Sequence, residues 1–443
     1  MKVAVIGVGH VGLVTCATLA HLGHDVAGVD VDPEKIALLA SGHVPFYEPR
    51  LPELVAEGFE QGRLRFSDDP AEAIPGAEVV FICVGTPADA GGQANLAAVE
   101  RSASAVARHA SGTTVVVEKS TVPAGTAARV RETLRRERPD VAFHVVSNPE
   151  FLREGQAIVD ALEPDRILVG ADDAEGLETM RRLYQPLTEH GHRMIETDVV
   201  TAELSKHACN AFLALKISYA NALARISELV GADVEAITDV MGTDPRIGRA
   251  FLKAGLGYGG YCFPKDVAAF QSFSSKLGYP FPLLSEIARI NDEAIDAAVA
   301  MVQDLVWNLA HKRVGLLGLS FKPGTDDIRL SPALALARRL IALEAEVAGY
   351  DPTAGEDAGR ELPSLIVAGD PYIAAEGAHV LIVATAWEEF RSLDLPRLRD
   401  AMARPLIVDG RNFLDPEQIA AAGFEYHALG RPSVAAGRPR TRT

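Results

Sequence analysis

The chain has 443 residues, of which 48% are hydrophobic and 23% charged, as in ordinary globular proteins of two or three domains. Its formal net charge of −17 argues against a nucleic-acid or membrane-surface partner, so an anionic ligand would need basic residues gathered locally. The 4 cysteines are too few and too dispersed for a disulfide framework or a metal cluster, and we expect no metal site. The start of the chain leads directly into a strand and no apolar run of about 18 residues occurs, which predicts a cytoplasmic protein without a membrane span.

The first elements predict a dinucleotide site. An apolar strand over 3–6 is followed by the glycine turn Gly7-Val8-Gly9-His10-Val11-Gly12, a helical stretch to Leu22, and a strand over 26–29 that ends at Asp30. This order of strand, glycine turn, helix, strand and acid is typical of dinucleotide binding. Asp30 should accept hydrogen bonds from ribose hydroxyls, which favours NAD over NADP; a flavin, or a glycine turn without a ligand, remains an alternative.

Further strands over 78–84, 114–118 and 143–146 alternate with helices, which predicts a parallel sheet covered on both faces. The middle of the chain reads instead as one long helix over 201–230 and more helix over 267–309, broken near Pro280 and Pro282. We interpret this block as a connector and an oligomer surface.

From Arg313 the alternation returns, and two of its segments echo the first module: 346–352 resembles 26–33, and 377–383 resembles 76–82. We therefore predict an α/β protein with two Rossmann-like doubly wound parallel-sheet domains, joined by a central helical domain that has one long helix. The boundaries are an NAD-binding domain at 1–197, a helical domain with the cysteine loop and a dimer surface at 198–310, a second Rossmann-like domain at 311–429, to which the family resemblance described below assigns the sugar nucleotide, and a disordered tail at 430–443.

The strongest catalytic candidate is Cys262, which follows a run of glycines and precedes Lys265 and Asp266. Positive charge near a thiol favours the reactive thiolate. Lys206 and Asn210 lie four residues apart on the long helix and therefore share a face. Taken alone, a helix lysine is usually solvated and a cysteine is usually a small buried hydrophobe. Their occurrence together with a dinucleotide site indicates a catalytic role.

A series of motifs resembles the UDP-glucose/GDP-mannose dehydrogenase family over nearly the whole chain. These motifs are Gly7–Gly12, Tyr47-Glu48-Pro49, Cys83–Pro87, 120–126, 147–155, Pro164-Asp165-Arg166, Lys206 with Asn210, Gly257–Asp266, 321–329 and Asp409-Gly410-Arg411. The resemblance implies a four-electron oxidation of UDP-glucose to UDP-glucuronate with two NAD, in which Cys262 forms a thiohemiacetal and then a thioester. Lys206 would stabilise oxyanions, and Asn210 would hold that oxygen or a water. Asp266 is the candidate for proton transfer, with Glu150 and Thr121 as partners; whether Lys206 or Asp266 is the first base stays open.

The same resemblance implies two sets of binding residues. The cofactor set is Gly7, Gly9, His10, Val11, Gly12, Asp30, Lys35, Gly85, Thr86, Thr121, Glu154, Lys265 and Arg329. The substrate set is Phe151, Leu152, Arg153, Glu154, Lys206, Asn210, Arg246, Phe251, Lys253, Gly257, Tyr258, Gly259, Lys322 and Arg411. Of these, Arg246 resembles an arginine that the family donates across a subunit interface, and we expect a homodimer or a higher homo-oligomer.

One position departs from the family pattern, because Tyr261 stands where a small residue such as serine is common. A phenol beside the nucleophile could alter the fit of the sugar. The same chemistry on GDP-mannose or a UDP-N-acetylhexosamine therefore stays open. Two alternatives of another kind also stay open: a two-electron hydroxyacid dehydrogenase that relies on Lys206 alone, and an NAD-binding protein without activity.

Overall fold

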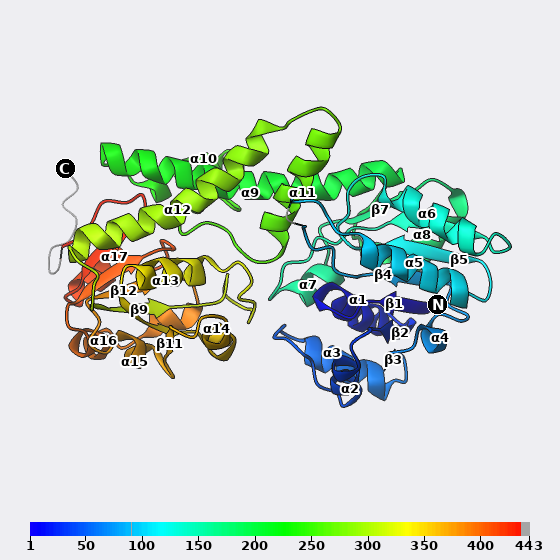
Figure 1. Ribbon diagram of the computed structural model, residues 1–443, viewed down its shortest axis with the longest axis horizontal. Helices are drawn as coiled ribbons and strands as arrows, with labels where there is room; N and C mark the ends of the chain where they lie inside the picture. Colours follow the sequence, from blue (N-terminus) through cyan, green and yellow to red (C-terminus); the bar gives the residue numbers. More distant parts are fainter. Residues whose placement is uncertain (90, 436–443) are drawn as a thin grey trace. The chain divides into compact units, whose positions relative to one another are not determined.

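The computed structural model describes residues 1–89 and 91–435. Contacts between Cα atoms divide the chain into two compact units, Met1–Cys209 with Ala268–Tyr279, and Asn210–Val267 with Pro280–Thr443. Two points of division fall within helices α9 (Val199–Val230) and α11 (Cys262–Lys276), drawn in green in Figure 1, and the third lies between Tyr279 and Pro280. The segment that we expected to form a separate helical domain is therefore shared between the two units.

The first unit is built on an eight-stranded sheet with the order β3-β2-β1-β4-β5-β6-β7-β8. The strands are β1 (Lys2–Ile6), β2 (Asp25–Val29), β3 (Leu64–Ser67), β4 (Val79–Ile82), β5 (Thr114–Glu118), β6 (Phe143–Ser147), β7 (Ile167–Ala171) and β8 (Met194–Thr197). The helices are α1 (His10–His21), α2 (Pro33–Ala40), α3 (Leu51–Glu60), α4 (Pro70–Ala73), α5 (Ala97–His109), α6 (Thr126–Glu137), α7 (Ala157–Leu162) and α8 (Ala174–Glu189).

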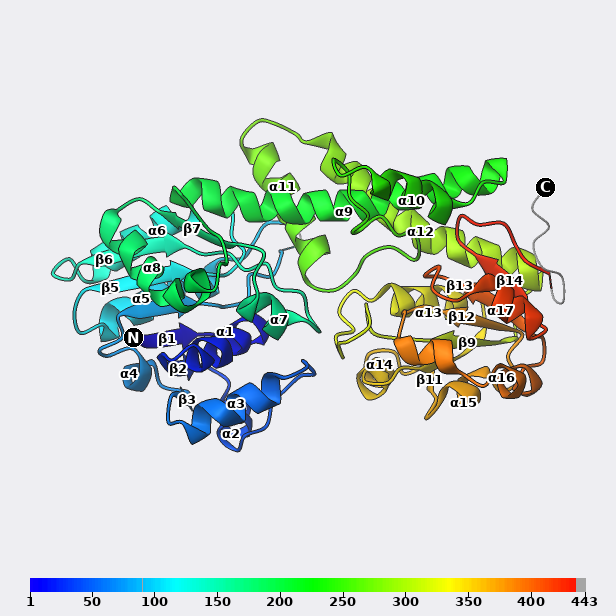
Figure 2. The ribbon, with the colours of Figure 1, turned by 180° about the vertical axis from the view of Figure 1, so that it is seen from behind.

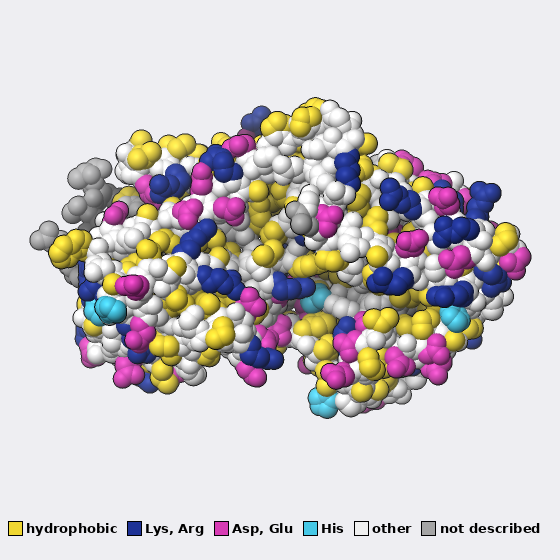
Figure 3. Space-filling view, viewed as in Figure 1, with side chains coloured by type: hydrophobic (Ala, Val, Ile, Leu, Met, Phe, Trp, Pro, Cys, Tyr) yellow, Lys and Arg dark blue, Asp and Glu magenta, His cyan; other side chains and the backbone are white. Residues whose placement is uncertain are grey.

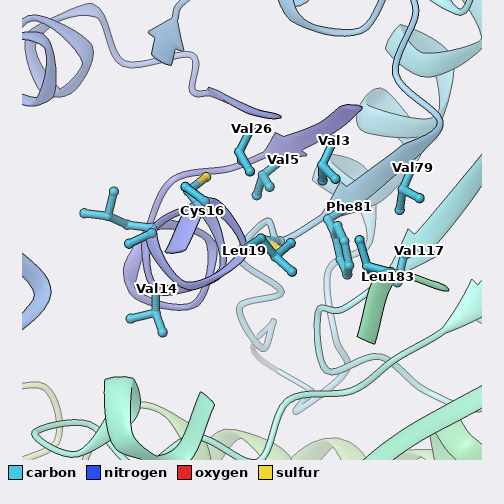
Figure 4. Packing of buried hydrophobic residues seen from close by; sticks show 14 of the residues in the cluster. Val3, Val5, Val14, Cys16, Leu19, Val26, Val79, Phe81, Val117 and Leu183 are labelled. Carbon is cyan, nitrogen blue, oxygen red and sulfur yellow. The ribbon is translucent and has the colours of Figure 1, made fainter. Parts of the chain in front are cut away.

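Alternating side chains of the strands feed two separate cores in this unit. Val3 and Val5 of β1 belong to the core beneath α1, α3, α7 and α8, whereas Ala4 and Ile6 belong to the core beneath α5 and α6. Figure 4 shows the first of these cores, in which Phe81 of β4 and Cys16 of α1 are buried with the valines. A strand that is apolar on both faces is the pattern expected for a sheet between two helical layers.

One pairing in the first sheet is antiparallel, although the sequence predicts a parallel sheet throughout. Strand β7 runs against β6, with Ser147 opposite Gly170 and Val146 opposite Ala171, and β8 is parallel to β7. The connection over 148–166 therefore starts and ends at the same edge of the sheet instead of crossing its face. It keeps the loop that follows β6 at the carboxyl edge, where ligands bind in open α/β sheets.

The second unit contains a six-stranded parallel sheet with the order β11-β10-β9-β12-β13-β14. Its strands are β9 (Arg313–Leu317), β10 (Glu346–Tyr350), β11 (Ile366–Val367), β12 (Val380–Val383), β13 (Leu406–Asp409) and β14 (Glu425–Ala428). Its helices are α10 (Val234–Thr243), α12 (Pro282–Val306), α13 (Pro332–Ala342), α14 (Gly355–Glu361), α15 (Pro371–Ala375), α16 (Leu395–Ala401) and α17 (Pro416–Ala421), with a 3-10 turn at Glu388–Ser392.

The two sheets repeat one topology, since β11-β10-β9-β12-β13-β14 has the same order as β3-β2-β1-β4-β5-β6. In the second sheet, α12 and α13 cover one face, and α16 and α17 pack on the core of the other. Figure 2 shows this unit from behind, with α13 and α16 on opposite sides of β9. The prediction of two Rossmann-like modules is confirmed.

The predicted disordered tail is wrong for its first residues. Gly430 donates its N–H to Glu228, Arg431 pairs with Asp233, and Val434 forms a β-bridge with Tyr426. Val434 is also buried against the second sheet, which anchors the segment. The rest of the predicted tail, 436–443, lies outside the described residues. Within the described chain, we find no helix that combines the length and the apolar character needed to cross a bilayer.

Candidate active site

The three glycines of the first loop have different steric surroundings. Gly7 follows β1 with φ +89°, a left-handed conformation that favours glycine. A Cβ atom at Gly12 would lie 1.8 Å from the carbonyl oxygen of Gly7, so α1 can approach the loop this closely only without a side chain. Around a Cβ atom at Gly9, the N-cap of α1, no described atom beyond its chain neighbours comes within 4 Å. This open space at a helix N-terminus fits a pyrophosphate group of NAD.

Asp30, which follows β2, stabilises the glycine loop 7–12 through hydrogen bonds. Its Oδ2 atom accepts hydrogen bonds from the backbone N–H of Val8 at 2.9 Å and from Lys35 Nζ at 3.0 Å. Its Oδ1 atom accepts from the N–H of Asp32 at 3.2 Å. Asp30 thus fixes the loop in addition to the ribose contact that the sequence predicts, and Lys35 balances its charge.

The loops after β4 and β5 meet beside the glycine loop, at the point where the strand order reverses. The Thr86 hydroxyl donates to the carbonyl of Thr121 at 2.9 Å, and the Ser120 hydroxyl donates to the carbonyl of Val84 at 2.8 Å. Because β1 and β4 are neighbours, these loops lie at the switch point of the sheet, where nucleotides bind in doubly wound folds.

A buried carboxylate, Glu48, connects the glycine loop to the loop that follows β6. It is 2% exposed and accepts the backbone N–H groups of Gly155 at 2.7 Å and Ala157 at 2.8 Å. Its Oε2 atom lies 2.9 Å from Nε2 of His10, the first residue of α1. The Tyr47-Glu48-Pro49 motif is visible in the sequence, but the role of Glu48 is not, because a charged residue in a loop gives no sign of burial.

The predicted substrate residues Phe151 to Glu154 follow β6 and are held by contacts within the protein. The Glu150 carboxylate accepts the N–H of Leu152 at 2.6 Å, which turns the chain after β6. Arg153 is paired with Asp160 at 2.5 Å, and the guanidinium of Arg166 lies 3.9 Å from the centre of the Phe151 ring. Arg153 is therefore engaged within the protein, and any contact with the nucleotide sugar requires this pair to be shared or opened.

Lys206 of α9 is a buried amine, not a solvated helix lysine. Its Nζ atom lies 2.9 Å from Oε1 of Glu150, and the two side chains are 5% and 7% exposed. The ammonium also lies 5.2 Å from the centre of the Phe151 ring. A cation held this way in a dry site can stabilise negative charge that develops on a substrate oxygen.

A second buried cation near this pair, Lys119, was missed by the sequence analysis. Its Nζ atom donates to Oδ1 of Asn148 at 3.0 Å. Burial lowers the pKa of Lys119, and nearby Cys83 and Glu150 oppose this shift. Burial also raises the pKa of the Cys83 thiol to about 12, so Cys83 remains a thiol at neutral pH. Lys119 directly follows the apolar strand β5, and a sequence cannot say whether such a lysine turns inward.

In the second unit, Cys262 is the first residue of α11. A helix N-terminus stabilises negative charge, which favours a thiolate at this position. One turn later, Asp266 is 1% exposed and accepts from Asn210 Nδ2 and from Lys265 Nζ, both at 2.6 Å. Because both carboxylate oxygens already have donors, the arrangement favours a role for Asp266 in orienting Asn210 and Lys265 over free proton transfer.

The glycines before Cys262 are packed without room for side chains. A Cβ atom at Gly257, which has φ +87°, would lie 2.5 Å from Oδ1 of Asn291. The same oxygen accepts the N–H of Tyr258 at 2.7 Å. Arg411 donates to the carbonyls of Gly257 at 2.8 Å and Ala384 at 2.7 Å, and its burial lowers its pKa to about 10. The predicted substrate residues Gly257, Tyr258, Gly259 and Arg411 therefore belong to one packed cluster.

The second sheet repeats the aspartate contacts of the first loop but not its open space. Gly318 has φ +94°, and Asp351 at the end of β10 accepts the N–H groups of Leu319 at 2.7 Å and Ser320 at 2.9 Å. Asp351 also accepts the Ser320 hydroxyl at 2.8 Å and the Trp387 indole N–H at 3.1 Å. Ser320 stands where the first loop has Gly9, so the second loop does not repeat the open space of the first.

The remaining predicted substrate cations lie at the surface of the second unit. Arg246 is 86% exposed and pairs with its neighbour Asp244 at 2.5 Å. Lys253 is exposed, with its Nζ atom 5.9 Å from the centre of the Phe413 ring, and Lys322 Nζ lies 5.5 Å from that of Phe321. Phe251 has φ +65° and packs beside Phe263. Figure 3 shows basic and acidic side chains interspersed over the visible face.

A glycine cradle at the switch point of one sheet, with a buried lysine and a helix-terminal cysteine in the same chain, is the combination expected of a dinucleotide-dependent oxidoreductase. Three family profiles match successive parts of the chain: the NAD binding domain over residues 1–188, the central domain over 200–293 and the UDP binding domain over 315–416 of the UDP-glucose/GDP-mannose dehydrogenase family. The chain belongs to this family, and its cofactor is NAD.

The similarity to individual relatives extends over nearly the full length. The chain is 44% identical to the UDP-glucose 6-dehydrogenase of Rhizobium meliloti (strain 1021), covering 98% of this chain and 100% of that protein. It is 39% identical to TuaD, a UDP-glucose 6-dehydrogenase of Bacillus subtilis (strain 168), covering 99% and 95%.

Solved structures agree with this fold. A UDP-glucose dehydrogenase from the archaeon Pyrobaculum islandicum superposes with a TM-score of 0.90 at 36% identity, covering 97% of this chain and 98% of that one. A UDP-D-ManNAc dehydrogenase from Pyrococcus horikoshii gives 0.86 at 28% identity, covering 97% and 99%.

Proposed function

We propose that the chain oxidises the C6 alcohol of UDP-glucose to the carboxylate of UDP-glucuronate, with two NAD consumed per sugar nucleotide. The observation that carries this proposal is Cys262 at the start of α11 in a chain whose first sheet has an open glycine cradle. A two-electron alcohol oxidation has no need of a nucleophilic cysteine, whereas a four-electron oxidation through a thioester does. Relatives named UDP-glucose 6-dehydrogenase support the choice of substrate.

In the proposed mechanism, NAD supplies the acceptor for the hydride that leaves C6 in each oxidation. The chain's own residues manage the oxygen and the protons. Lys206 stabilises the alkoxide that forms when the C6 hydroxyl passes its proton to water, and Glu150 keeps the ammonium in place at 2.9 Å. The Cys262 thiolate then adds to the aldehyde carbon, giving a thiohemiacetal.

Loss of the second hydride from the thiohemiacetal leaves a thioester on Cys262. Water adds to the thioester carbonyl, the C–S bond breaks, and the products are the carboxylate and the free thiol. Asn210, held by Asp266 at 2.6 Å, is suited to orient that water or the C6 oxygen. Thr121, at the carboxyl edge of β5, is a partner for proton transfer through water. The roles of these side chains are proposals that rest on their contacts and on the family motifs.

We further propose that the three segments of the chain divide the work: 1–197 binds NAD, 198–310 supplies Cys262 and the oligomer surface, and 311–429 binds the nucleotide. Arg411, buried and cationic, supplies positive charge in the third segment. The reaction is placed in the cytoplasm, where NAD and sugar nucleotides are available.

A homodimer through α9 is part of the proposal. Phe212, Tyr219 and Ile226 follow one another at seven-residue intervals and are 60%, 49% and 56% exposed. Residues at this spacing share one helix face, and such an apolar stripe is typical of a subunit interface. Arg246, exposed nearby in sequence, would then serve the neighbouring subunit. Light scattering should give a dimer or larger species for the wild type and a smaller one for Ile226→Glu; a monomeric wild type would contradict the proposal.

The test of the activity is a panel of UDP- and GDP-sugars scored by NADH yield. UDP-glucose should give two NADH per molecule and a uronate product. A yield of one NADH with a free aldehyde would refute the four-electron oxidation. A clear preference for GDP-mannose or a UDP-N-acetylhexosamine would show that this other sugar nucleotide is the substrate.

The matched variant is Cys262→Ser. It should bind UDP-glucose with wild-type affinity in calorimetry but lose steady-state uronate formation, because an oxygen ester on serine does not turn over as a thioester does. Full activity in this variant would refute the covalent route.

A further inference from the structure

The loop that carries Thr121 leads into helix α6 through a residue without a side chain. The N-cap of α6 is Gly125, which has φ +92° and therefore offers no side-chain oxygen to the helix. The first N–H groups of a helix have no partner within it, so the start of a buried helix needs acceptors from elsewhere. At α6, two of these N–H groups are bound by a side chain of another helix, α9.

That side chain is Glu203. Its Oε2 atom accepts the N–H of Gly125 at 2.6 Å, and its Oε1 atom accepts the N–H of Ala127 at 2.8 Å. Glu203 is 2% exposed, so these hydrogen bonds are shielded from water. A carboxylate at the N-terminus of a helix is also stabilised by the helix dipole. Glu203 therefore fixes the point at which the loop turns into α6.

A second residue of α9 holds the loop closer to Thr121. His207 lies one turn after Glu203, on the same helix face, and its Nε2 atom donates to the carbonyl of Val122 at 2.9 Å. His207 is 2% exposed, and its ring packs beside Phe270 of the same unit, with 5.8 Å between the ring centres. The backbone directly after Thr121 is therefore attached to α9 as well.

These contacts join the Thr121 loop to the helix that carries Lys206. Lys206 lies between Glu203 and His207 in the sequence of α9, and its Nζ atom pairs with Glu150 at 2.9 Å. All five residues belong to the first compact unit. The side chain proposed for proton transfer and the one proposed to stabilise the alkoxide are thus held by the same helix.

We propose that Glu203 is a positioning residue for Thr121, because it holds the loop 121–127 on α9 and keeps the Thr121 hydroxyl in place relative to Lys206. The inference rests on the proposed function, in which Thr121 takes part in proton transfer. Without the Glu203 carboxylate, two N–H groups lose their acceptor, and the loop shifts to find other partners for them. The substrate residues 151–154 are held by other contacts and keep their place.

The experiment measures the steady-state kinetics of Glu203→Ala and Glu203→Gln in the full-length protein. Glu203→Ala should lower kcat by about tenfold to a hundredfold, since a misplacement of about 1 Å can cost a hundredfold in rate. Its KM for UDP-glucose should match the wild type. Glu203→Gln keeps one acceptor oxygen and should recover part of kcat, and it takes the place of the alanine variant if that variant does not fold.

A mutant cycle separates positioning from a general loss of stability. In a Thr121→Ala background, Glu203→Ala should cause little further loss of kcat, because the hydroxyl that it positions is already absent. The control is Asp173→Ala, which removes the acceptor of the Gly176 N–H at the start of α8. This control should lower the melting temperature but keep the wild-type kcat.

Wild-type kcat in folded Glu203→Ala, or in Glu203→Gln where the alanine variant does not fold, would overturn the inference. An equal fold loss from the Glu203 substitution with and without the Thr121 hydroxyl would also overturn it, as would wild-type kcat in Thr121→Ala itself. A wild type that forms no uronate would instead overturn the proposed function.

Discussion

Replacing Glu48 should loosen the loop after β6, although Glu48 is not among the residues proposed to act on the substrate. Its carboxylate accepts the N–H groups of Gly155 and Ala157, and also contacts His10. In Glu48→Ala, these two amides lose their acceptor, and each buried unpaired donor costs about 1–3 kcal/mol. Because Gly155 is only partly buried, we take the lower part of this range for it and expect about 3 kcal/mol in total.

Such a loss lowers the free energy of local opening, which raises the exchange rate of the affected amides by about 100-fold. Hydrogen–deuterium exchange with mass spectrometry should locate this change in peptides that span 150–158. Glu48→Gln keeps one acceptor oxygen and should show a smaller effect. The control is Glu57→Ala, since Glu57 forms an exposed pair with His21 at 3.1 Å and should leave these peptides unchanged. Wild-type exchange at 150–158 in folded Glu48→Ala protein would refute this reasoning.

Three other predictions follow from burial and packing. Gly9→Ala should keep the wild-type melting temperature but bind NAD at least tenfold more weakly in calorimetry. Gly12→Ala should lower the melting temperature, because its Cβ atom would lie 1.8 Å from the carbonyl oxygen of Gly7. Equal melting temperatures for the two variants would contradict this prediction. Burial raises the pKa of Glu118 well above its usual 4.5, so the protonated form of this group favours the folded state. Its contribution to stability, full below about pH 4.5, is therefore lost as the pH rises. The gain in melting temperature of Glu118→Gln over the wild type should therefore grow from pH 5 to pH 8, and a constant gap would be evidence against a protonated Glu118. Burial also raises the pKa of Cys83 to about 12 and that of Cys16 well above its usual value. Iodoacetamide at pH 8 should therefore label Cys262 in the folded protein but not Cys83 or Cys16, as measured by peptide mass spectrometry. Comparable labelling of Cys83 would show that the core is open.

Much of the fold could be predicted because its signals are local. The apolar runs, the glycine turn and the acid at the end of the second strand define a module whose parts lie within about thirty residues of each other. The direction of β7 could not be predicted in this way, since an apolar strand has the same pattern in either direction. The anchoring of Val434 was missed for a related reason, because one apolar residue in a Pro- and Arg-rich stretch has no periodicity.

In the candidate site, too, local motifs could be predicted and contacts between distant residues could not. Motifs predicted which side chains to examine, and the structure shows which of them are engaged: Asp30 with Lys35, Lys206 with Glu150, and Asp266 with Asn210. The roles of Glu48 and Lys119 could not be predicted from sequence, since they come from burial and from partners that are distant in the chain. Tyr261 was recognised as unusual, but its neighbour Arg329 lies 68 positions further along the sequence, and only packing brings the two together.

The interleaving of the two compact units has a consequence for the order in which the protein can be made. Residues Ala268–Tyr279 belong to the first unit, although the segment 210–267 that precedes them belongs to the second. Within the first unit, Phe270 packs against His207, and Lys276 contacts Gln93. As the chain emerges from the ribosome, the NAD-binding unit therefore stays incomplete until well after its sheet has been synthesised. A fragment that ends at Cys209 would lack these contacts. A truncated protein meant to contain the whole cofactor-binding unit must therefore also include residues 268–279.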